Sequence, residues 1–403
     1  MTDWQELDKA YVMPTYSQSK LPIAIEKGEG SYLYDTEGNR YLDLFGGLAV
    51  NVLGHSHPEV VKTLKEQGEK FLHISNIYLN QPAIQLAKTL VDHSIRGKVF
   101  FANSGAEATE AAVKLIHKWR MKHAPERNGI VVLEKSFHGR TLGALKLTRQ
   151  PGVQQDFPQP DFEVIEVEKE NLTEMEKVIQ ERQPLAVLME PVLGSGGILP
   201  LSEKYLQEVE KLCRQYEVLF CMDEIQTGMG RTSKLFAYQH AGVSPDLILF
   251  AKGIGGGLPL SGIIAGEKLE NSFSSGDHGT TFAPSPLSAA LGNTVLRILL
   301  EEGQLQDGRE KAIYLWDKLT DLKEQFPETL ASIRGRGMMI GIVSNKDAEF
   351  VAELRKTMVE KGFLIDVTQK TIIRLLPPLT LTEEEIDTFI AALQQTITEL
   401  ISS

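Results

Sequence analysis

The central part of the chain alternates short, continuous apolar runs with amphipathic stretches. The runs cover residues 98–102, 130–133, 185–189, 218–222 and 247–251. A strand with one wet face alternates apolar and polar residues, whereas a strand covered on both faces is apolar throughout. The pattern therefore predicts an α/β domain whose strands lie between two layers of helices.

The flanking regions have a different pattern. Residues 31–34 and 41–43 surround the turn sequence 35–39 and predict a hairpin. From about residue 287, long helical stretches are followed by apolar runs at 338–343 and 372–376 and by a helix from roughly residue 383. We therefore expect a large central domain flanked by the two terminal parts of a smaller one.

Composition and charge exclude several classes of protein. The 403 residues are 42% apolar, and the formal net charge of −12 opposes binding to a nucleic-acid backbone or an anionic membrane. No apolar run approaches the ~20 residues that span a bilayer, and no basic leader is present. Cys213 and Cys221 are too few for a disulfide framework. We expect a protein of the reducing cytosol.

Two candidate reactive groups end consecutive predicted strands. Asp223 follows the run at 218–222, and Lys252 follows the run at 247–251. Because ligands of open α/β sheets bind at the carboxyl ends of the strands, the two side chains could meet at one edge. A desolvated lysine is nucleophilic toward aldehydes, and a carboxylate stabilises a protonated ring nitrogen. The alternatives are a helix-capping acid and a surface lysine.

Residues 103–107 predict a helix N-terminus that could bind an anion. Ser104 and Glu107 have the spacing of a capping box, and Gly105 removes the side chain that would block close approach. A capping box without a ligand explains the segment equally well. No Walker A pattern is present, and the glycines at 335–341 precede a strand, so we reject a nicotinamide-binding site.

Other side chains suit a flat anionic ligand. Phe137, His138 and Arg140 share one loop after the run at 130–133, and Arg374 lies within apolar sequence before two prolines. An aromatic ring can stack on a cofactor and an arginine can bind a carboxylate, but a packed ring and a structural salt bridge are the alternatives. His55 and His57 have no convincing third ligand, so we expect no metal site.

These motifs, in this order, resemble the class III pyridoxal-phosphate aminotransferases, and within them the acetylornithine and ornithine aminotransferases. The matching segments are residues 46–58, 103–107, 136–141, 190–191, 223–231, 251–253, 278–281 and 373–379. The resemblance implies fold type I, with residues 51–286 as a large cofactor-binding domain that has a mostly parallel sheet. Residues 1–50 and 287–403 would then form the smaller α+β domain.

The resemblance also implies roles for residues around pyridoxal 5'-phosphate. Lys252 would bind the cofactor covalently as an imine, Asp223 would bind the pyridinium nitrogen, and Gln226 would approach the phenolic oxygen. The remaining cofactor-binding residues would be Ser104, Gly105 and Ala106 at the phosphate, Phe137 over the ring, His138, and Thr281 reaching the phosphate from a second subunit. This last contact requires a homodimer.

For the substrates, the resemblance implies that Arg140 binds a substrate carboxylate and that Arg374 binds the α-carboxylate of glutamate or 2-oxoglutarate. Glu190 and, at the mouth of the site, Tyr16 would be further substrate-binding residues. The expected reaction moves the terminal amino group of N2-acetyl-L-ornithine or ornithine to 2-oxoglutarate, in arginine biosynthesis in the cytoplasm. The alternatives are another ω-amino-acid transaminase, such as one for 4-aminobutyrate, an epimerase, or a non-catalytic binding protein on this scaffold.

Two segments depart from the family pattern. Ser195 stands where related transaminases have a glutamate that pairs with the second arginine. We therefore expect Arg374 to lack an acidic partner, so that either the donor preference shifts or Ser195 substitutes for the acid through a bridging water. Residues 283–285 read Ala-Pro-Ser where Gly-Gly-Asn is usual, a change expected to reshape the subunit boundary.

Overall fold

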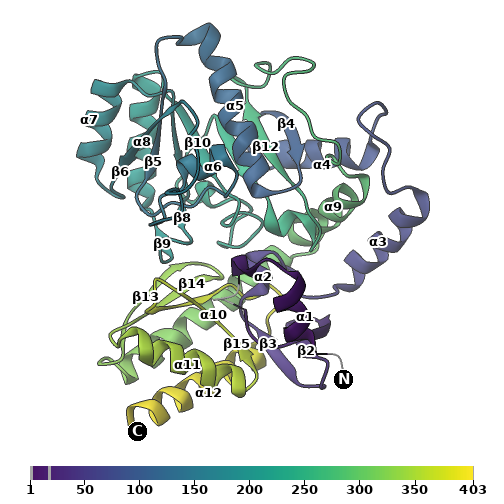
Figure 1. Cartoon of the computed structure of the whole chain (residues 1–403), viewed down its shortest axis with the longest axis vertical. Helices are drawn as coiled ribbons and strands as arrows, with labels where there is room; N and C mark the ends of the chain where they lie inside the picture. Colours follow the sequence, from purple (N-terminus) through teal and green to yellow (C-terminus); the bar gives the residue numbers. More distant parts are fainter. Residues whose placement is uncertain (1–2, 17–19, 403) are drawn as a thin grey trace.

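A seven-stranded sheet forms the centre of the computed structural model, which describes residues 3–16 and 20–402 (Figure 1). The strand order is β4-β12-β11-β10-β7-β5-β6. All neighbours pair in parallel except β12, which is antiparallel to both β4 and β11. The strands are β4 (Gly97–Ala102), β5 (Gly129–Leu133), β6 (Glu163–Val167), β7 (Ala186–Met189), β10 (Leu219–Asp223), β11 (Leu247–Phe250) and β12 (Ser261–Gly266). The mostly parallel central sheet is confirmed.

The five predicted apolar runs are all strands, and each places alternate side chains in two separate hydrophobic clusters. In β10, Phe220 and Met222 join one cluster, while Leu219 and Cys221 join the other. The second cluster includes the buried face of α5 (Gly105–His123), and the first contains side chains from the helices of the opposite face. Continuous apolar runs therefore reflect strands that are buried on both faces.

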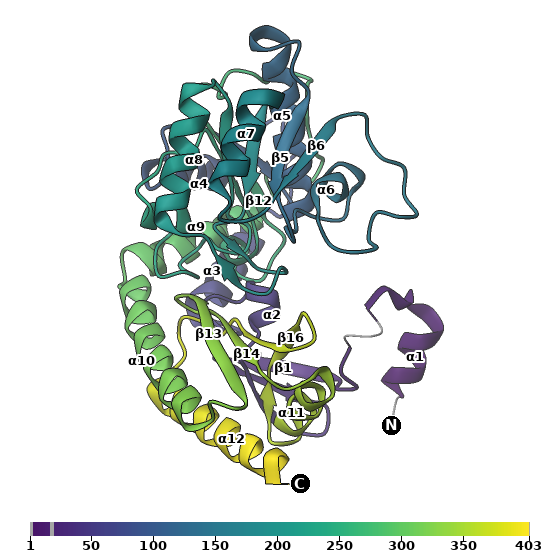
Figure 2. The same ribbon diagram turned by 90° about the vertical axis from the view of Figure 1, so that its left-hand side faces the viewer.

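Helices cover this sheet on both faces (Figures 1 and 2). Besides α5, the helices of this lobe are α3 (Pro58–Lys70), α4 (Gln81–Asp92), α6 (Leu142–Leu147), α7 (Leu172–Arg182), α8 (Glu203–Gln215) and α9 (Pro286–Leu300). Helix α9 packs on α3 and α4, although it follows the sheet in sequence.

Two strands of the central sheet were not predicted from the sequence. Strand β6 is the last strand of the sheet and alternates exposed and buried residues, so it has no continuous apolar run. Strand β12 begins Ser-Gly, and a Cβ atom on Gly262 would lie 2.3 Å from the carbonyl oxygen of Phe100. The small residues that permit this close pairing weaken the strand signal.

Segments from both ends of the chain build the second lobe, at the bottom of Figure 1. One sheet has the order β1-β2-β3-β15 and the other β13-β14-β17-β16. Because β3 pairs with β15, the predicted N-terminal hairpin shares a sheet with C-terminal residues. The strands are β1 (Ile25–Glu29), β2 (Tyr32–Asp35), β3 (Arg40–Asp43), β13 (Leu330–Arg336), β14 (Met339–Ser344), β15 (Phe363–Leu364), β16 (Asp366–Thr368) and β17 (Ile372–Leu375).

Three long helices support these small sheets: α10 (Gln304–Gln325), α11 (Ala348–Glu360) and α12 (Glu383–Ser402). The short α2 (Gly46–Ala49) leads from the first sheet toward the large lobe, and α1 (Trp4–Tyr11) stands apart from the body of the molecule (Figure 2). None of the helices within the described residues is long and apolar enough to cross a membrane.

Candidate active site

A cavity of about 490 Å³ lies at the carboxyl ends of β10 and β11. Asp223 is the last residue of β10, and Lys252 lies two residues after the end of β11. The parallel pairing of these strands brings both side chains to the same cavity. Ten residues to which the sequence analysis gave a catalytic or binding role line it: Ser104, Gly105, Ala106, Phe137, His138, Arg140, Glu190, Asp223, Gln226 and Lys252.

The carboxylate of Asp223 is held from two sides. Its Oδ2 lies 2.6 Å from Nδ1 of His138, and its Oδ1 accepts a hydrogen bond from the backbone N–H of Ile225 at 3.1 Å. Both side chains of the His138–Asp223 pair are almost fully buried. These two contacts fix the orientation of the Asp223 carboxylate in the wall of the cavity.

Lys252 is held in a strained and desolvated setting. Its φ angle is 52°, in the left-handed region that residues other than glycine seldom adopt. Burial lowers the pKa of Lys252 to about 8, although Asp223 and Glu190 raise it, and Arg374 lowers it further. The amine is therefore much closer to its neutral, nucleophilic form at physiological pH than an exposed lysine.

Glu190 is a second buried acid of the cavity. Its Oε1 accepts from the N–H of Phe137 at 2.9 Å, and its Oε2 accepts from the N–H of Gly194 at 3.2 Å. Burial raises the pKa of Glu190 to about 7, an effect that His138 opposes and Asp223 reinforces. The acid thereby ties the loop that carries Phe137 to the loop that carries Ser195.

The first turn of α5 forms another part of the cavity wall. The predicted capping box is present: Ser104 Oγ accepts from the N–H of Glu107, whose Oε2 accepts from the N–H of Ser104. The first N–H groups of a helix have no partner within it, so Gly105 and Ala106 present amides to the cavity that they line. This wall suits a phosphate group.

Gln226 and Arg140 also line the cavity. A Cβ atom on Gly194 would lie 2.0 Å from Oε1 of Gln226, so the glycine is required for the amide to pack there. The guanidinium of Arg140 lies 5.4 Å from the ring centroid of Phe137. The loop after β5 thus supplies an aromatic face and a cation together.

Thr281 and Tyr16 do not line this cavity within the described part of the chain. Tyr16 ends the short helix η1 (Pro14–Tyr16) and is 70% exposed. The segment that contains Thr281 is tied instead to residues 76–80, because Asn76 Nδ2 donates to the carbonyl of Thr280 at 3.0 Å and Asn80 Nδ2 to that of Pro284 at 2.8 Å. The roles predicted for both residues stay predictions.

The expectation that Arg374 lacks an acidic partner is wrong. Asp366 Oδ2 accepts a hydrogen bond from Nε of Arg374 at 2.8 Å and lies 2.7 Å from its Nη2 as an ion pair. The two residues face each other across the antiparallel pair β16 and β17. Sequence reasoning missed Asp366 because only the strand register reveals this partner. The hairpin-like spacing of polar residues between 366 and 374 was the signal that could have found it.

His55, the first of the two histidines, is bound to a buried acid. His55 Nε2 lies 2.8 Å from Oδ2 of Asp43, which also accepts hydrogen bonds at its other oxygen from the N–H groups of Phe45 and Gly46. Across the residues that the structure describes, no cluster of three or more histidine, cysteine or acidic side chains could hold a metal ion.

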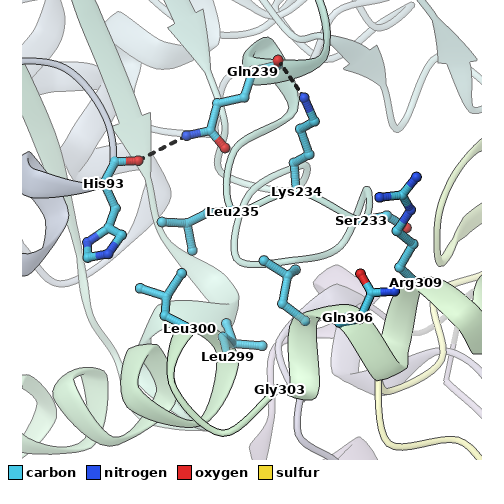
Figure 3. Close-up of a pocket in the computed structure, with 11 residues that line it drawn as sticks. His93, Ser233, Lys234, Leu235, Gln239, Leu299, Leu300, Gly303, Gln306 and Arg309 are labelled. Carbon is cyan, nitrogen blue, oxygen red and sulfur yellow. Dashed lines mark hydrogen bonds between the residues drawn. The ribbon is translucent and has the colours of Figure 1, made fainter.

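A separate cavity of about 400 Å³ contains none of the predicted site residues (Figure 3). It lies where the loop around Lys234 meets α10, and Lys234 Nζ donates to the carbonyl of Gln239, whose side-chain amide donates to the carbonyl of His93. These contacts join loops of the scaffold.

Comparison with known proteins decides the family. The family model described as "Aminotransferase class-III" matches residues 14–397. The chain belongs to the class III aminotransferases. This aminotransferase is 40% identical over 394 residues to the acetylornithine aminotransferase of Caldanaerobacter subterraneus, with 98% of each chain covered.

Solved structures agree in fold over the whole chain. The N-acetylornithine aminotransferase of Stenotrophomonas maltophilia is 31% identical, with a TM-score of 0.82 and coverage of 96% of this chain and 98% of that one. The ornithine aminotransferase of Toxoplasma gondii, crystallised with oxidised glutathione and with partial occupancy of PLP at its active site, is 26% identical. Its TM-score is 0.92, with 99% of this chain and 94% of that chain covered. The class III aminotransferase described here is a PLP-dependent enzyme of fold type I.

The cavity of this aminotransferase fits pyridoxal phosphate. Among the described residues, His138 Nε2 and Gln226 Oε1 are buried without a hydrogen-bond partner, and both side chains line the cavity. A buried polar atom without a partner is costly unless a ligand satisfies it. The amides of α5 suit the phosphate of the cofactor, and the ring of Phe137 suits its flat ring. The carboxylate of Asp223 suits the ring nitrogen, and the amine of Lys252 suits the aldehyde.

Proposed function

We propose that the enzyme transfers the terminal amino group of N2-acetyl-L-ornithine, or of ornithine, to 2-oxoglutarate, giving the semialdehyde and L-glutamate in arginine biosynthesis. The observation that carries this proposal is the convergence of Lys252, Asp223 and Arg140 on one cavity, in a chain 40% identical to an acetylornithine aminotransferase over 98% of its length. Proteins with that name occur among its relatives from bacteria and an archaeon.

When bound, the cofactor supplies an electron sink for the carbanion that forms as a substrate carbon loses its proton. The amine of Lys252 is the proposed base that removes this proton and returns one to the cofactor side. Asp223 would stabilise positive charge at the ring nitrogen, and His138 orients Asp223 through the 2.6 Å contact. Gly105 and Ala106 would bind the phosphate, and Phe137 would cover the ring.

The substrate carboxylates need cations because the chain as a whole is acidic. Arg140 lines the cavity and suits the carboxylate at the far end of the donor. Arg374 would bind the carboxylate next to the reacting carbon of glutamate. Glu190 would hold the pocket loops around the substrate, and Tyr16 would lie at its mouth.

We propose a homodimer with the active site at the subunit interface. Large apolar side chains are exposed together beside the segment of Thr281: Ile77 is 83% exposed, Leu79 86% and Phe282 67%. A cluster of exposed apolar side chains of this kind indicates a protein interface. A second subunit seated there would place its Thr281 near the cofactor phosphate.

The domain division and compartment are also proposals. Residues 51–286 would form the cofactor-binding domain, with 1–50 and 287–403 forming the small domain, except that α9 packs on α3 and α4 and goes with the large lobe. The enzyme would work in the cytoplasm. Two buried free cysteines are compatible with a reducing compartment.

A donor panel tests the proposed reaction. The purified enzyme is supplied with 2-oxoglutarate, and glutamate formation is measured with N2-acetylornithine, ornithine, 4-aminobutyrate and plain α-amino acids. We expect the highest kcat/KM with N2-acetylornithine or ornithine. Equal or higher values with 4-aminobutyrate would support the alternative ω-amino-acid transaminase, and racemisation without glutamate would support an epimerase.

A further inference from the structure

Arg374 is a buried cation, and two of its nitrogen atoms contact the same carboxylate oxygen of Asp366. Its Nε donates a hydrogen bond to Oδ2 of Asp366 at 2.8 Å, and its Nη2 lies 2.7 Å from the same oxygen as an ion pair. The side chains are 10% and 18% exposed. The pair is formed by residues directly opposite each other in adjacent antiparallel strands, so the backbone fixes it.

The ion pair lies beside the active site. Arg374 is close enough to Lys252 to lower the pKa of that amine, and its guanidinium lies 5.5 Å from the ring centroid of Phe45. Among the described residues that line the cavity, however, neither Arg374 nor Asp366 is found. Pairing with Asp366 thus keeps the cation near the site but withdrawn from it.

The strand of Asp366 is also joined to the wall of the cavity. Ser195 lines the cavity, and its carbonyl accepts hydrogen bonds from Thr368 Oγ1 at 3.3 Å and from Gln369 Nε2 at 3.0 Å. Thr368 and Gln369 lie two and three residues after Asp366 in the chain. Hydrogen bonds therefore connect the loop that carries Ser195 to the segment that carries Asp366.

Only one of the two proposed substrates has a carboxylate that Arg374 could bind at the reacting carbon. This argument rests on the proposed function. The reacting carbon of the amino donor carries no carboxylate, whereas that of glutamate or 2-oxoglutarate carries one. An unpaired buried arginine would favour donors that react through an α-amino group and would be costly while the proposed donor is bound. A permanently paired arginine could not bind the α-carboxylate of glutamate.

We propose that Asp366 is a specificity-determining residue that masks Arg374 while the amino donor reacts and releases it to the α-carboxylate of glutamate or 2-oxoglutarate. The exchange replaces one carboxylate by another on the same guanidinium, so Arg374 keeps an ionic partner in both states. Asp366 is partly exposed and regains water when it is released. A side chain outside the cavity thus takes the place of an acid at position 195.

Binding of glutarate, an unreactive dicarboxylate, tests this masking without any turnover. We expect Asp366→Asn holoenzyme to bind glutarate about tenfold more tightly in calorimetric titration, because a competing charge-assisted hydrogen bond has been weakened. In single half-reactions, kcat/KM for glutamate should rise while that for the ω-amino donor does not. In an Arg374→Gln background, the Asp366→Asn change should have no effect on glutarate affinity.

A second pair of variants moves the acid instead of deleting it. Ser195→Glu should weaken glutarate binding, and Ser195→Glu combined with Asp366→Asn should restore approximately the wild-type value. Glu399→Gln removes the acid of another small-domain ion pair, that with Lys361, and should change neither measurement. Melting temperatures of all variants monitor folding.

Two results would overturn the proposal: unchanged or weaker glutarate binding in folded Asp366→Asn enzyme, or a gain that persists when Arg374 is replaced. Either result would make the ion pair structural. Failure of the proposed donor is a separate outcome, since wild-type enzyme that rejects N2-acetylornithine but shows the predicted glutarate series would refute only the donor assignment.

Discussion

Nδ1 of His138 lies 2.6 Å from Oδ2 of Asp223, and both side chains are almost completely buried. His138 comes from the loop after β5 and Asp223 from the end of β10, two strands that are separated in the sheet by β7 alone. The contact orients the carboxylate that we assign to the ring nitrogen of the cofactor. The hydrogen-bonding contact with His138 also offsets part of the free-energy cost of burying the carboxylate of Asp223.

Removing the charge of Asp223 should impair chemistry far more than folding. We expect Asp223→Asn to lower kcat by about 10²–10³-fold, the order found when one buried electrostatic partner of a reacting group is lost. The visible spectrum of the bound cofactor should change with it. Stopped-flow half-reactions and the absorption spectrum check both effects.

Glu224 is the matched control, because it is the adjacent buried acid but accepts hydrogen bonds from Thr227 and from the N–H groups of Ala237 and Tyr238. Glu224→Gln should lower the unfolding free energy and leave the cofactor spectrum unchanged. The assignment would fail if the two variants had equal effects on the spectrum.

The buried amine of Lys252 should make the stability of the cofactor-free protein depend on pH. Its pKa is lowered from 10.5 to about 8, mainly by burial. Between these values the unfolded chain binds more protons than the folded one, so this contribution to stability is present above pH 10.5 and is lost as the pH falls through about 8.

Lys252→Met removes this dependence. At pH 7, we expect cofactor-free Lys252→Met protein to have an unfolding free energy higher by about 1–3 kcal/mol, and the difference should shrink as the pH rises. Urea unfolding between pH 7 and 9.5 measures it. Lys65→Met, at an exposed position of α3, should show no such trend; a constant difference for Lys252→Met would contradict the prediction.

Five of the seven strands of the central sheet were predicted from the sequence, as was the convergence of Asp223 and Lys252 on one cavity. Both predictions depend on local pattern and on the geometry common to parallel sheets. The capping box at Ser104 is likewise a local feature. The Asp366–Arg374 pair was missed because it depends on which residues of β16 and β17 face each other. The pairing of β3 with β15 joins distant segments, which local periodicity does not report.

Gly139 should be essential for the phosphate-binding wall. Its φ is 132°, and a Cβ atom would lie 2.8 Å from Cβ of Ala144 and 3.1 Å from Cα of Ala106. Gly139→Ala should therefore displace the first turn of α5 and weaken cofactor affinity by at least about tenfold, since oriented charge-assisted hydrogen bonds are lost. Fluorescence titration of the cofactor-free protein measures this affinity.

Gly152→Ala is the control, because Gly152 also has a positive φ of 77° but no atom lies within 4 Å of its added Cβ. This variant bears the backbone strain without displacing α5. Equal losses of affinity in the two variants would show that the effect of Gly139 is general destabilisation.

The exposed apolar residues beside Thr281 should hold two subunits together. Leu79→Asp places a charge on a side chain that is 86% exposed in the single chain, and we expect it to shift the enzyme from dimer to monomer. Sedimentation velocity measures the change, and cofactor affinity should fall in parallel. Met121→Asp, at another exposed apolar position, should leave the dimer intact; a dimer that tolerates Leu79→Asp would contradict the proposed interface.

The most direct test of the central claim is to locate the covalent bond to the cofactor. The purified enzyme is reduced with borohydride, digested and mapped by mass spectrometry. The account predicts loss of the yellow colour and one phosphopyridoxyl group, attached to the side chain of Lys252. A modified lysine elsewhere, or a colourless protein that takes up no cofactor, would contradict it.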